Sequence, residues 1–552
     1  TKTPRNFIAI GRNDIGELIT SEVGKDGQEF LGYSRTSGGN RTIYFESRLN
    51  YNKTLNNVHH LDGLFLFNLR DYVDQSVSEA IGALPYRNTG IAGRTAYSYA
   101  DRYFTEFNFG YNGSENFKRG YRFGFFPSFA VGWMPSSERF FEPLRGTVSK
   151  LKFRGSWGLV GNDRIQGDGT ADTRRFAYLS TIESVSGYSF GYTNNFGYGG
   201  WREGEFGIEN MTWETAEKLD VGMELGLWNN ALHVQVDWFN EKRRDIFMRR
   251  KTIPETAGYN LLPFANYGRV DNRGFEVELL VNHSFSPDWF ISARGNFTYA
   301  KNTVIEYDES ENLKQSFRAR TGRPLNQHFG LVAERLYSYS DFDDESKNLL
   351  REDVPEPSYG PVRAGDIKYK DLNNDGIINS DDETAIGKPY VPQKIFGFGI
   401  NTRYKQFDLG FLFQGATDFT NMMQGATLVP GSGGGGTGNI YANVDDRWTP
   451  ENPSSNVIWP RLSSSQSSNN MRYSTWWLVD ASYLRLKNME VGYTLPQTAR
   501  DKLLMKNARV FLRGSNLLTF SYFKMWDPEI GSQNGLKYPL QRIVSGGIEI
   551  TF

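Results

Sequence analysis

Apolar and polar residues alternate along most of this chain. In the last ten residues, 543–552, the even-numbered and odd-numbered positions differ in polarity. One side is apolar and ends in an aromatic residue: Val544, Gly546, Ile548, Ile550 and Phe552. Side chains of a strand alternate between its two faces, so this segment predicts a strand with one apolar face. A soluble edge strand has this pattern, and so does the closing strand of an outer-membrane barrel.

The pattern recurs in fifteen segments of the chain. Most of them approach the length of about ten residues that a tilted strand needs to cross a bilayer. The segments lie near 41–52, 58–71, 91–101, 102–113, 122–134, 150–160, 216–228, 230–241, 272–284, 289–301, 393–404, 406–416, 482–494, 507–516 and 543–552. A weaker candidate lies near 27–36. The recurrence predicts an all-β fold, a transmembrane antiparallel β-barrel.

The connections between these segments differ in length. Short ones, such as 228–230 and 285–288, contrast with long ones at 161–214, 302–392 and 417–480. Short turns on one side and long extracellular loops on the other are typical of outer-membrane barrels. Single-chain bacterial barrels use an even number of strands, and an unclosed sheet leaves backbone groups unpaired in hydrocarbon. Either one strand escapes the pattern, or the chain is part of a larger barrel.

Composition narrows the function classes. The chain has 552 residues and a net charge of -1, which argues against nucleic acid as a partner because no basic excess can neutralise phosphates. Hydrophobic residues make up only 38%, as expected when every second strand residue meets lipid, although a large soluble β-protein would also fit. The chain lacks cysteine, so it has neither a disulfide framework nor a thiolate metal site.

The sharpest local motif is an acidic loop at residues 371–382. It has the D-x-N-x-D-G spacing of an EF-hand calcium loop, with Gly376 at the sharp turn and a backbone carbonyl at the seventh position. The candidate ligands are Asp371, Asn373, Asp375, Ile377, Asn379 and Asp382. The twelfth position carries Asp382 where glutamate is usual. The motif predicts a structural Ca²⁺ site that orders the long loop 302–392; an Asx-rich surface turn is the alternative.

No segment predicts catalysis. The glycine-rich run 431–438 lacks the G-K-[ST] ending of a phosphate loop, and the sequence contains no nucleophile elbow. We therefore expect the protein not to be an enzyme.

Aromatic residues crowd the segment 178–201. We take Tyr188, Tyr192, Tyr198 and Trp201 as candidate substrate-binding residues, because aromatic rings stack on sugar faces. A loop that packs on itself, or an aromatic girdle at the membrane interface, explains the same residues equally well.

Several stretches resemble the SusC/RagA family of TonB-dependent outer-membrane transporters of Bacteroidota. The resemblance spans residues 90–552 and is carried by 122–133, 151–162, 365–371 with 386–387, 448–453, 482–488 with 492–496, 515–518 and 527–529, and the terminal Phe552. It implies part of a large plugged barrel, consistent with 22 strands. It also implies a multi-pass protein of the cell outer membrane that imports oligosaccharides or peptides. The implied partners are a SusD-like surface lipoprotein, the TonB complex and outer-membrane lipid.

The chain departs from the family in its first residues. Residues 1–5 contain no signal segment, and no plug domain or TonB-interacting box precedes the first strands. We therefore expect residues 1–552 to be the C-terminal part of a receptor barrel without its plug, with TonB acting through a missing N-terminal region. Two alternatives to an importer stay open: a SusC-like barrel that is a structural subunit of a larger outer-membrane assembly, and a non-energised porin.

Overall fold

The structure is a computed structural model. It describes residues 6–23, 38–74, 83–166, 173–190, 196–425, 428–430, 440–463 and 467–552. The chain divides into two compact units. The smaller comprises Thr1–Phe45 and Asn68–Asn88, and the larger comprises Glu46–Phe67 and Thr89–Phe552. The smaller unit contains a hairpin of β1 (Asn6–Arg12) and β2 (Leu18–Val23).

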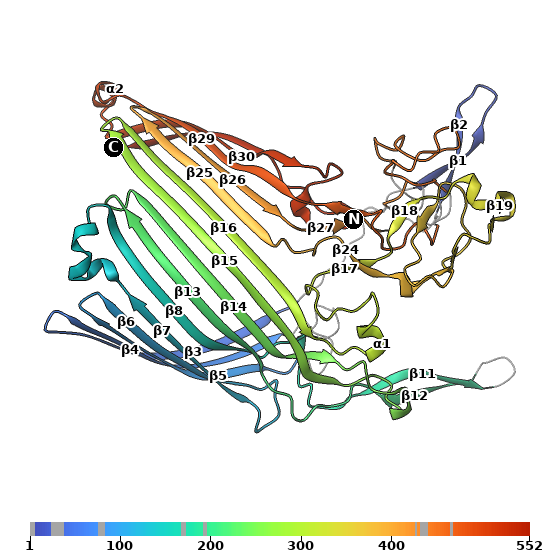
Figure 1. Cartoon of the computed structure of the whole chain (residues 1–552), viewed down its shortest axis with the longest axis horizontal. Helices are drawn as coiled ribbons and strands as arrows, with labels where there is room; N and C mark the ends of the chain where they lie inside the picture. The colour runs from blue at the N-terminus through green and yellow to red at the C-terminus, as the bar shows by residue number, and fades with distance from the viewer. Residues whose placement is uncertain are drawn as a thin grey trace. The chain divides into compact units, whose positions relative to one another are not determined.

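One sheet of 15 strands dominates the fold, and its strands are hydrogen-bonded neighbours in the order of the sequence. Figure 1 shows β13 to β16, β25, β26, β29 and β30 side by side. The strands are β3 (Asn40–Leu55), β4 (His59–Asp74), β5 (Tyr86–Tyr99), β6 (Tyr103–Ser114), β7 (Phe123–Trp133), β8 (Val148–Asn162), β13 (Glu214–Leu227), β14 (Leu232–Arg249), β15 (Phe264–Ser286), β16 (Trp289–Glu306), β25 (Lys394–Tyr404), β26 (Phe407–Thr417), β29 (Tyr483–Thr494), β30 (Asn507–Ser521) and β31 (Ile543–Thr551).

The fifteen strands expected from the alternating pattern are confirmed, and the all-β fold with them. The weaker candidate near 27–36 lies outside the described residues. Several strands are longer than the pattern indicates: β15 has 23 residues and β16 has 18. A bilayer crossing takes only about ten residues. The ends of these strands therefore pair beyond that length, where no apolar face is needed and the alternation fades.

The short connections form tight turns. Asn56 and Asn57 between β3 and β4 both have positive φ, as do Ala100 and Asp101 between β5 and β6. Two residues with positive φ give the turn whose twist matches antiparallel strands, and asparagine tolerates this conformation well. Helix α2 (Gln497–Lys502) closes the connection from β29 to β30 at the same end of the sheet.

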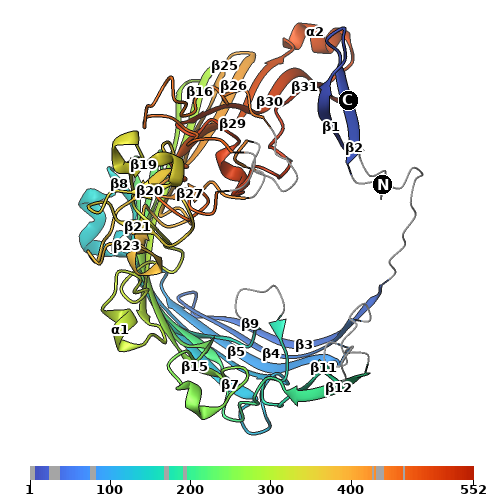
Figure 2. The same cartoon turned by 90° about the vertical axis from the view of Figure 1, so that its right-hand side faces the viewer.

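The long connections fold into small strands of their own. Figure 2 looks onto the end of the sheet that carries them. The connection between β8 and β13 holds β9 (Ile165–Gln166), β10 (Thr173–Arg174), β11 (Ile182–Phe190) and β12 (Phe196–Glu203). The next holds α1 (Glu311–Lys314), β17 (His328–Gly330), β18 (Ala333–Leu336), β19 (Phe342–Asp344), β20 (Leu349–Leu350), β21 (Glu356–Pro357), β22 (Ile367–Tyr369), β23 (Ile377–Ile378) and β24 (Thr384–Ile386). The connection from β26 to β29 holds β27 (Thr420–Met422) and β28 (Leu478–Asp480).

Short 3-10 helices complete the secondary structure. They lie at Pro135–Ser137, Arg139–Leu144, Glu255–Ala257, Tyr339–Asp341, Glu345–Lys347, Ser380–Asp382 and Pro528–Ile530. Across the described ranges, every helix is too short or too polar to cross a bilayer.

The main hydrophobic cluster lies in the long connections. We call the described residues of 307–393, 418–482 and 522–542 the loop body. Its core members come from all three connections, and each is buried: Leu331, Leu336, Tyr337, Phe342, Val362, Ala364, Ile367, Tyr369, Ile378, Ile386, Met422, Met423, Leu428, Val429, Trp448, Trp459, Trp477 and Phe523. A shared core means that segments about 100 residues apart stabilise one another as a single folded body.

Candidate functional site

The two faces of the sheet have opposite chemistry. Val221 of β13 pairs with Gly155 on one side and Trp238 on the other, and Trp238 pairs with Phe275. Val221, Trp238 and Phe275 are all at least 40% exposed. Because cross-strand partners share a face, the apolar positions of successive strands form a continuous exposed surface. Monomeric soluble proteins rarely expose so large an apolar patch.

The opposite face carries ion pairs between strands. On β8 and β13, Lys150 Nζ lies 2.6 Å from Glu224 Oε2. On β8 and β14, the guanidinium of Arg154 donates to the carboxylate of Asp237. The register explains both contacts. Lys152 is the direct partner of Glu224, and Lys150 lies two residues away on the same face of β8. Gly222 lies between Arg154 and Asp237. The small residue between them lets charged side chains reach across one strand.

A second charged group lies on the same face near the C-terminus. Arg509 of β30 donates to Asp408, with Nε 3.0 Å from Oδ1, and to Glu490, with Nη2 2.6 Å from Oε1. Arg513 also pairs with Glu490. A cavity of about 520 Å³ adjoins these residues and is lined on its polar side by Arg294, Asn401, Arg403, Asp408, Asn488, Glu490 and Arg513. This face is a charged wall suited to contact with water or a polar cargo.

A buried carboxylate joins two long connections of the loop body. Asp366 is fully buried and accepts from Arg461, with Nε 3.1 Å from Oδ1 and Nη2 3.1 Å from Oδ2. Asn470 Nδ2 and the backbone N–H of Arg363 donate to the same carboxylate at 2.9 and 2.8 Å. The backbone N–H of Ile367 donates to Asn470 Oδ1, and Asn469 Nδ2 donates to the carbonyl of Ile367. These bonds fix strand β22 against the segment 461–470.

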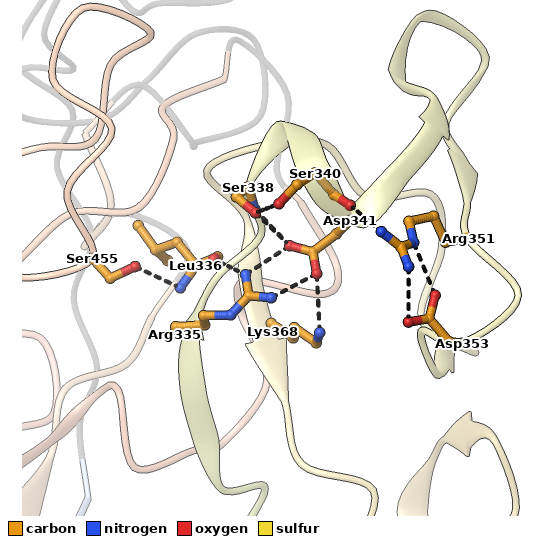
Figure 3. Close-up of polar contacts among 9 residues, drawn as sticks. All are labelled: Arg335, Leu336, Ser338, Ser340, Asp341, Arg351, Asp353, Lys368 and Ser455. Carbon is orange, nitrogen blue, oxygen red and sulfur yellow. Dashed lines mark hydrogen bonds and ion pairs between the residues drawn. The ribbon is translucent and has the colours of Figure 1, made fainter.

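A second polar cluster lies at the start of the loop body (Figure 3). The fork of Arg335 donates to both oxygens of Asp341 at 2.6 Å, and Lys368 Nζ lies 3.1 Å from Oδ1. Ser338 donates through its backbone N–H and its hydroxyl. Burial alone raises the pKa of Asp341, but these hydrogen bonds outweigh it and hold the pKa well below its usual range. The carboxylate therefore stays ionised and ties β18 and β22 to the 3-10 helix Tyr339–Asp341.

The acidic loop forms a compact turn around its own oxygens. Asp371 accepts from the backbone N–H groups of Asn374 and Gly376 at 2.6 and 2.8 Å. Asn374 and Gly376 have φ of 59° and 83°. Asp382 is fully buried, and its two oxygens accept from Leu372 N and Asn379 N. The structure thus brings the first and twelfth positions of the motif into one turn, as an EF-hand loop requires.

The other proposed ligands also lie in this turn. Asn373 Oδ1 accepts from Asp375 N, Asp375 Oδ1 accepts from Ile377 N, and Asn379 Oδ1 accepts from Asp381 N. Each side-chain oxygen therefore supports the backbone. In the described part of the chain, no three His, Cys, Asp or Glu side chains gather as a metal-binding group. The calcium site stays a prediction.

The aromatic candidates lie on the hairpin of β11 and β12. Tyr188 pairs with Tyr198 along the hairpin, while Trp201 pairs with Ser184 on a separate rung. Tyr188 and Trp201 are 73% and 76% exposed. Tyr192 lies outside the described residues, as does the glycine-rich run 431–438. The hairpin presents aromatic side chains to solvent, and their role in binding stays a prediction.

A further cavity was not indicated by the sequence. It has a volume of about 700 Å³ and lies in the loop body, lined by Met423, Tyr441, Ala442, Asn443, Ile458, Val479, Asp480, Tyr522, Phe523, Lys524 and Met525. Its residues come from five separate stretches of the chain. The segment 522–526, rich in aromatic residues and methionine, directly follows strand β30, but no site was predicted from it.

The chain is similar to receptors and transporters of outer membranes. It is 28% identical over 455 residues to TonB-dependent receptor P3 of Formosa agariphila, covering 80% of this chain and 42% of that protein. It is 25% identical over 462 residues to TonB-dependent receptor SusC of Bacteroides thetaiotaomicron, covering 81% of this chain and 42% of that protein. The chain thus spans less than half the length of these two relatives. No protein-family profile matches it.

A solved structure shares the fold. The RagAB peptide transporter superposes with a TM-score of 0.69 at 20% identity, covering 93% of this chain and 56% of the matched chain. The superposition shows that the fifteen-stranded sheet shares its fold with that protein.

Proposed function

We propose that the chain forms the wall of an outer-membrane importer of the SusC/RagA family of TonB-dependent transporters. Its large antiparallel sheet and its similarity to TonB-dependent receptor SusC and to the RagAB peptide transporter support this proposal. The observation that carries the proposal is the division of one sheet into an exposed apolar face and a charged face. Val221 and Phe275 lie on the first, and Glu224 and Arg509 on the second. In a transmembrane barrel the apolar face meets lipid and the polar face meets the lumen.

The proposed cargo is an oligosaccharide or a peptide. Two features support import of such a solute: the ion-paired polar wall, and the loop body with a core of its own at one end of the strands. We propose that a SusD-like surface lipoprotein delivers the solute to this end and that the TonB complex supplies the energy. The relatives named TonB-dependent receptor support the TonB complex as a partner. The SusD-like lipoprotein follows from the resemblance to the SusC/RagA family.

Deleting the gene is expected to abolish growth on one defined glycan or peptide mixture while growth on glucose is unchanged, because a large solute needs a dedicated route. Growth of the deletion strain on single nutrients measures this, with the intact gene restored as the control. Unchanged growth on every nutrient would instead favour a structural subunit of a larger assembly. Import that persists without TonB would favour a non-energised porin.

We also propose that Ca²⁺ orders the acidic loop through Asp371, Asn373, Asp375, Asn379, Asp382 and the carbonyl of Ile377. Oxygen ligands at these positions suit this cation, and its role would be structural. Chelation is expected to speed proteolytic cleavage within 302–392, and added Ca²⁺ should reverse the effect whereas Mg²⁺ should not. A variant that carries both Asp371→Asn and Asp375→Asn should be cleaved with and without Ca²⁺ as fast as the chelated parent protein. Cleavage that ignores the chelator would remove the calcium proposal.

A further inference from the structure

The cavity of about 700 Å³ in the loop body has an apolar floor. Met423 and Phe523 are 5% and 7% exposed and belong to the main core, so the floor is firmly held. Val479 and Ile458 are half-buried against the same core. Phe523 packs against Trp526, and the two rings meet edge-on with their centroids 4.8 Å apart. The floor is therefore preformed.

The sides of the cavity are aromatic and adaptable. Tyr441 stacks on the fully buried Trp459, with ring centroids 5.7 Å apart and planes 10° from parallel. Met525 also lines the cavity, and its sulfur accepts a hydrogen bond from Asn443 Nδ2 at 3.3 Å. Thioether side chains change shape at low cost, so Met525 lets one cavity fit apolar groups of different outline.

The rim of the cavity is polar and carries both signs of charge. Asp480 and Lys524 are exposed, and neither forms an ion pair within the described part of the chain. One oxygen of Asp480 accepts from Ser482 N, which leaves the other oxygen without a hydrogen bond to a described residue. Tyr522 stands at the rim with 91% of its surface exposed. An exposed tyrosine beside an apolar cavity is typical of a contact residue.

We propose that this cavity is a binding subsite for an apolar side chain of a peptide, aromatic or branched aliphatic, whose main chain lies across the polar rim. The inference rests on the proposed import function and narrows its cargo. An apolar side chain on Met423, Val479, Ile458 and Phe523 leaves no polar group unpaired. A sugar in the same place would press hydroxyls against these side chains, and burying a hydroxyl without a hydrogen-bond partner is unfavourable. Main-chain N–H and C=O groups suit Asp480 and Lys524 at the rim.

Binding of short probes to the full-length transporter, purified in detergent, tests the proposal. The probes are Gly-Gly-Phe-Gly-Gly, pentaglycine and maltopentaose, titrated with ligand-observed NMR. The phenylalanine probe is expected to bind at least about tenfold more tightly than pentaglycine, the factor that burial of one aromatic side chain supports. Maltopentaose is expected to bind no better than pentaglycine.

Two variants locate the binding. Tyr522→Ala is expected to weaken the phenylalanine probe about fivefold, because it removes one aromatic contact. Ala442→Trp fills the cavity from an exposed position and is expected to abolish the preference for phenylalanine. Tyr538→Ala is the matched control, since Tyr538 is 83% exposed in the same connection but does not line the cavity. Heat-modifiable gel mobility checks that each variant is folded.

Three outcomes would overturn the inference. They are equal binding of the phenylalanine and glycine probes, tighter binding of maltopentaose, and a phenylalanine preference that survives Ala442→Trp. If the deletion strain fails to grow on a nutrient and the purified protein shows one of these outcomes, the subsite is refuted and the import function still stands. Phenylalanine binding that responds to both variants in a strain without any growth defect would support the subsite and refute import.

Discussion

Replacing Arg461 with methionine is expected to destabilise the loop body by about 3 kcal/mol, because removal of one partner leaves a buried charge uncompensated. Asp366 is fully buried, and both of its oxygens accept from Arg461. Methionine keeps the length and apolar stem of the side chain but no donor. Hydrogen exchange should show the backbone amides of β22 opening about a hundredfold faster than in the parent protein.

Two further variants make this prediction specific. Asp366→Asn added to Arg461→Met should recover most of the lost protection, since the charge is gone and Asn470 still donates to the remaining carbonyl oxygen. Arg351→Met is the surface control, because Arg351 and Asp353 are 49% and 68% exposed (Figure 3). Exposed pairs contribute about 0–1 kcal/mol, so little change is expected there. Equal effects of Arg351→Met and Arg461→Met would contradict the role given to Asp366.

Replacing Val221 with arginine is expected to destabilise the folded barrel by about 2–4 kcal/mol, the cost of a cation near the bilayer midplane on the lipid face. Val221 lies near the middle of β13, between Gly155 and Trp238, and is 51% exposed. Urea titration of the full-length protein folded into phospholipid vesicles measures the loss. The same substitution should cost much less in detergent micelles that adapt around the charge.

Asn296→Arg is the matched control for the opposite face. Asn296 lies on β16 across from Glu278 and Gly397, so an arginine there meets a carboxylate and open space. We expect a change of less than about 1 kcal/mol, the size usual for an exposed ion pair. If both variants lose the same stability in vesicles, the assignment of the two faces is wrong. A stable Val221→Arg variant would remove lipid contact from this part of the sheet.

The strands were predictable because their signal is local. Within β13, Leu219, Val221 and Met223 alternate with Asp220 and Gly222, and the alternation alone identifies both the strand and its two faces. Register follows from the same pattern once neighbours are paired by short turns. The strand ends were missed where the pattern stops, as in the first residues of β15. There, hydrogen bonding to the neighbours continues without an apolar face to mark it.

The candidate site was much less predictable. The spacing of 371–382 predicted a calcium loop, and calcium binding there stays a prediction. The structure shows that its first and twelfth residues, Asp371 and Asp382, accept hydrogen bonds from backbone groups of the same loop. The cavity, in contrast, joins Met423, Tyr441, Val479 and Tyr522 from stretches up to about 100 residues apart. No short-range pattern marks such a set.

The alternating residues are enough to predict an antiparallel sheet with an apolar and a polar face, since side-chain alternation depends only on the extended backbone. The resemblance to known transporters pointed to the same barrel. Three features became visible only in the folded chain: the long connections fold around one core, Asp366 joins them through Arg461, and a cavity opens beside Tyr522. These features depend on contacts between residues distant in the chain, and such contacts form only when many weak packing interactions act together.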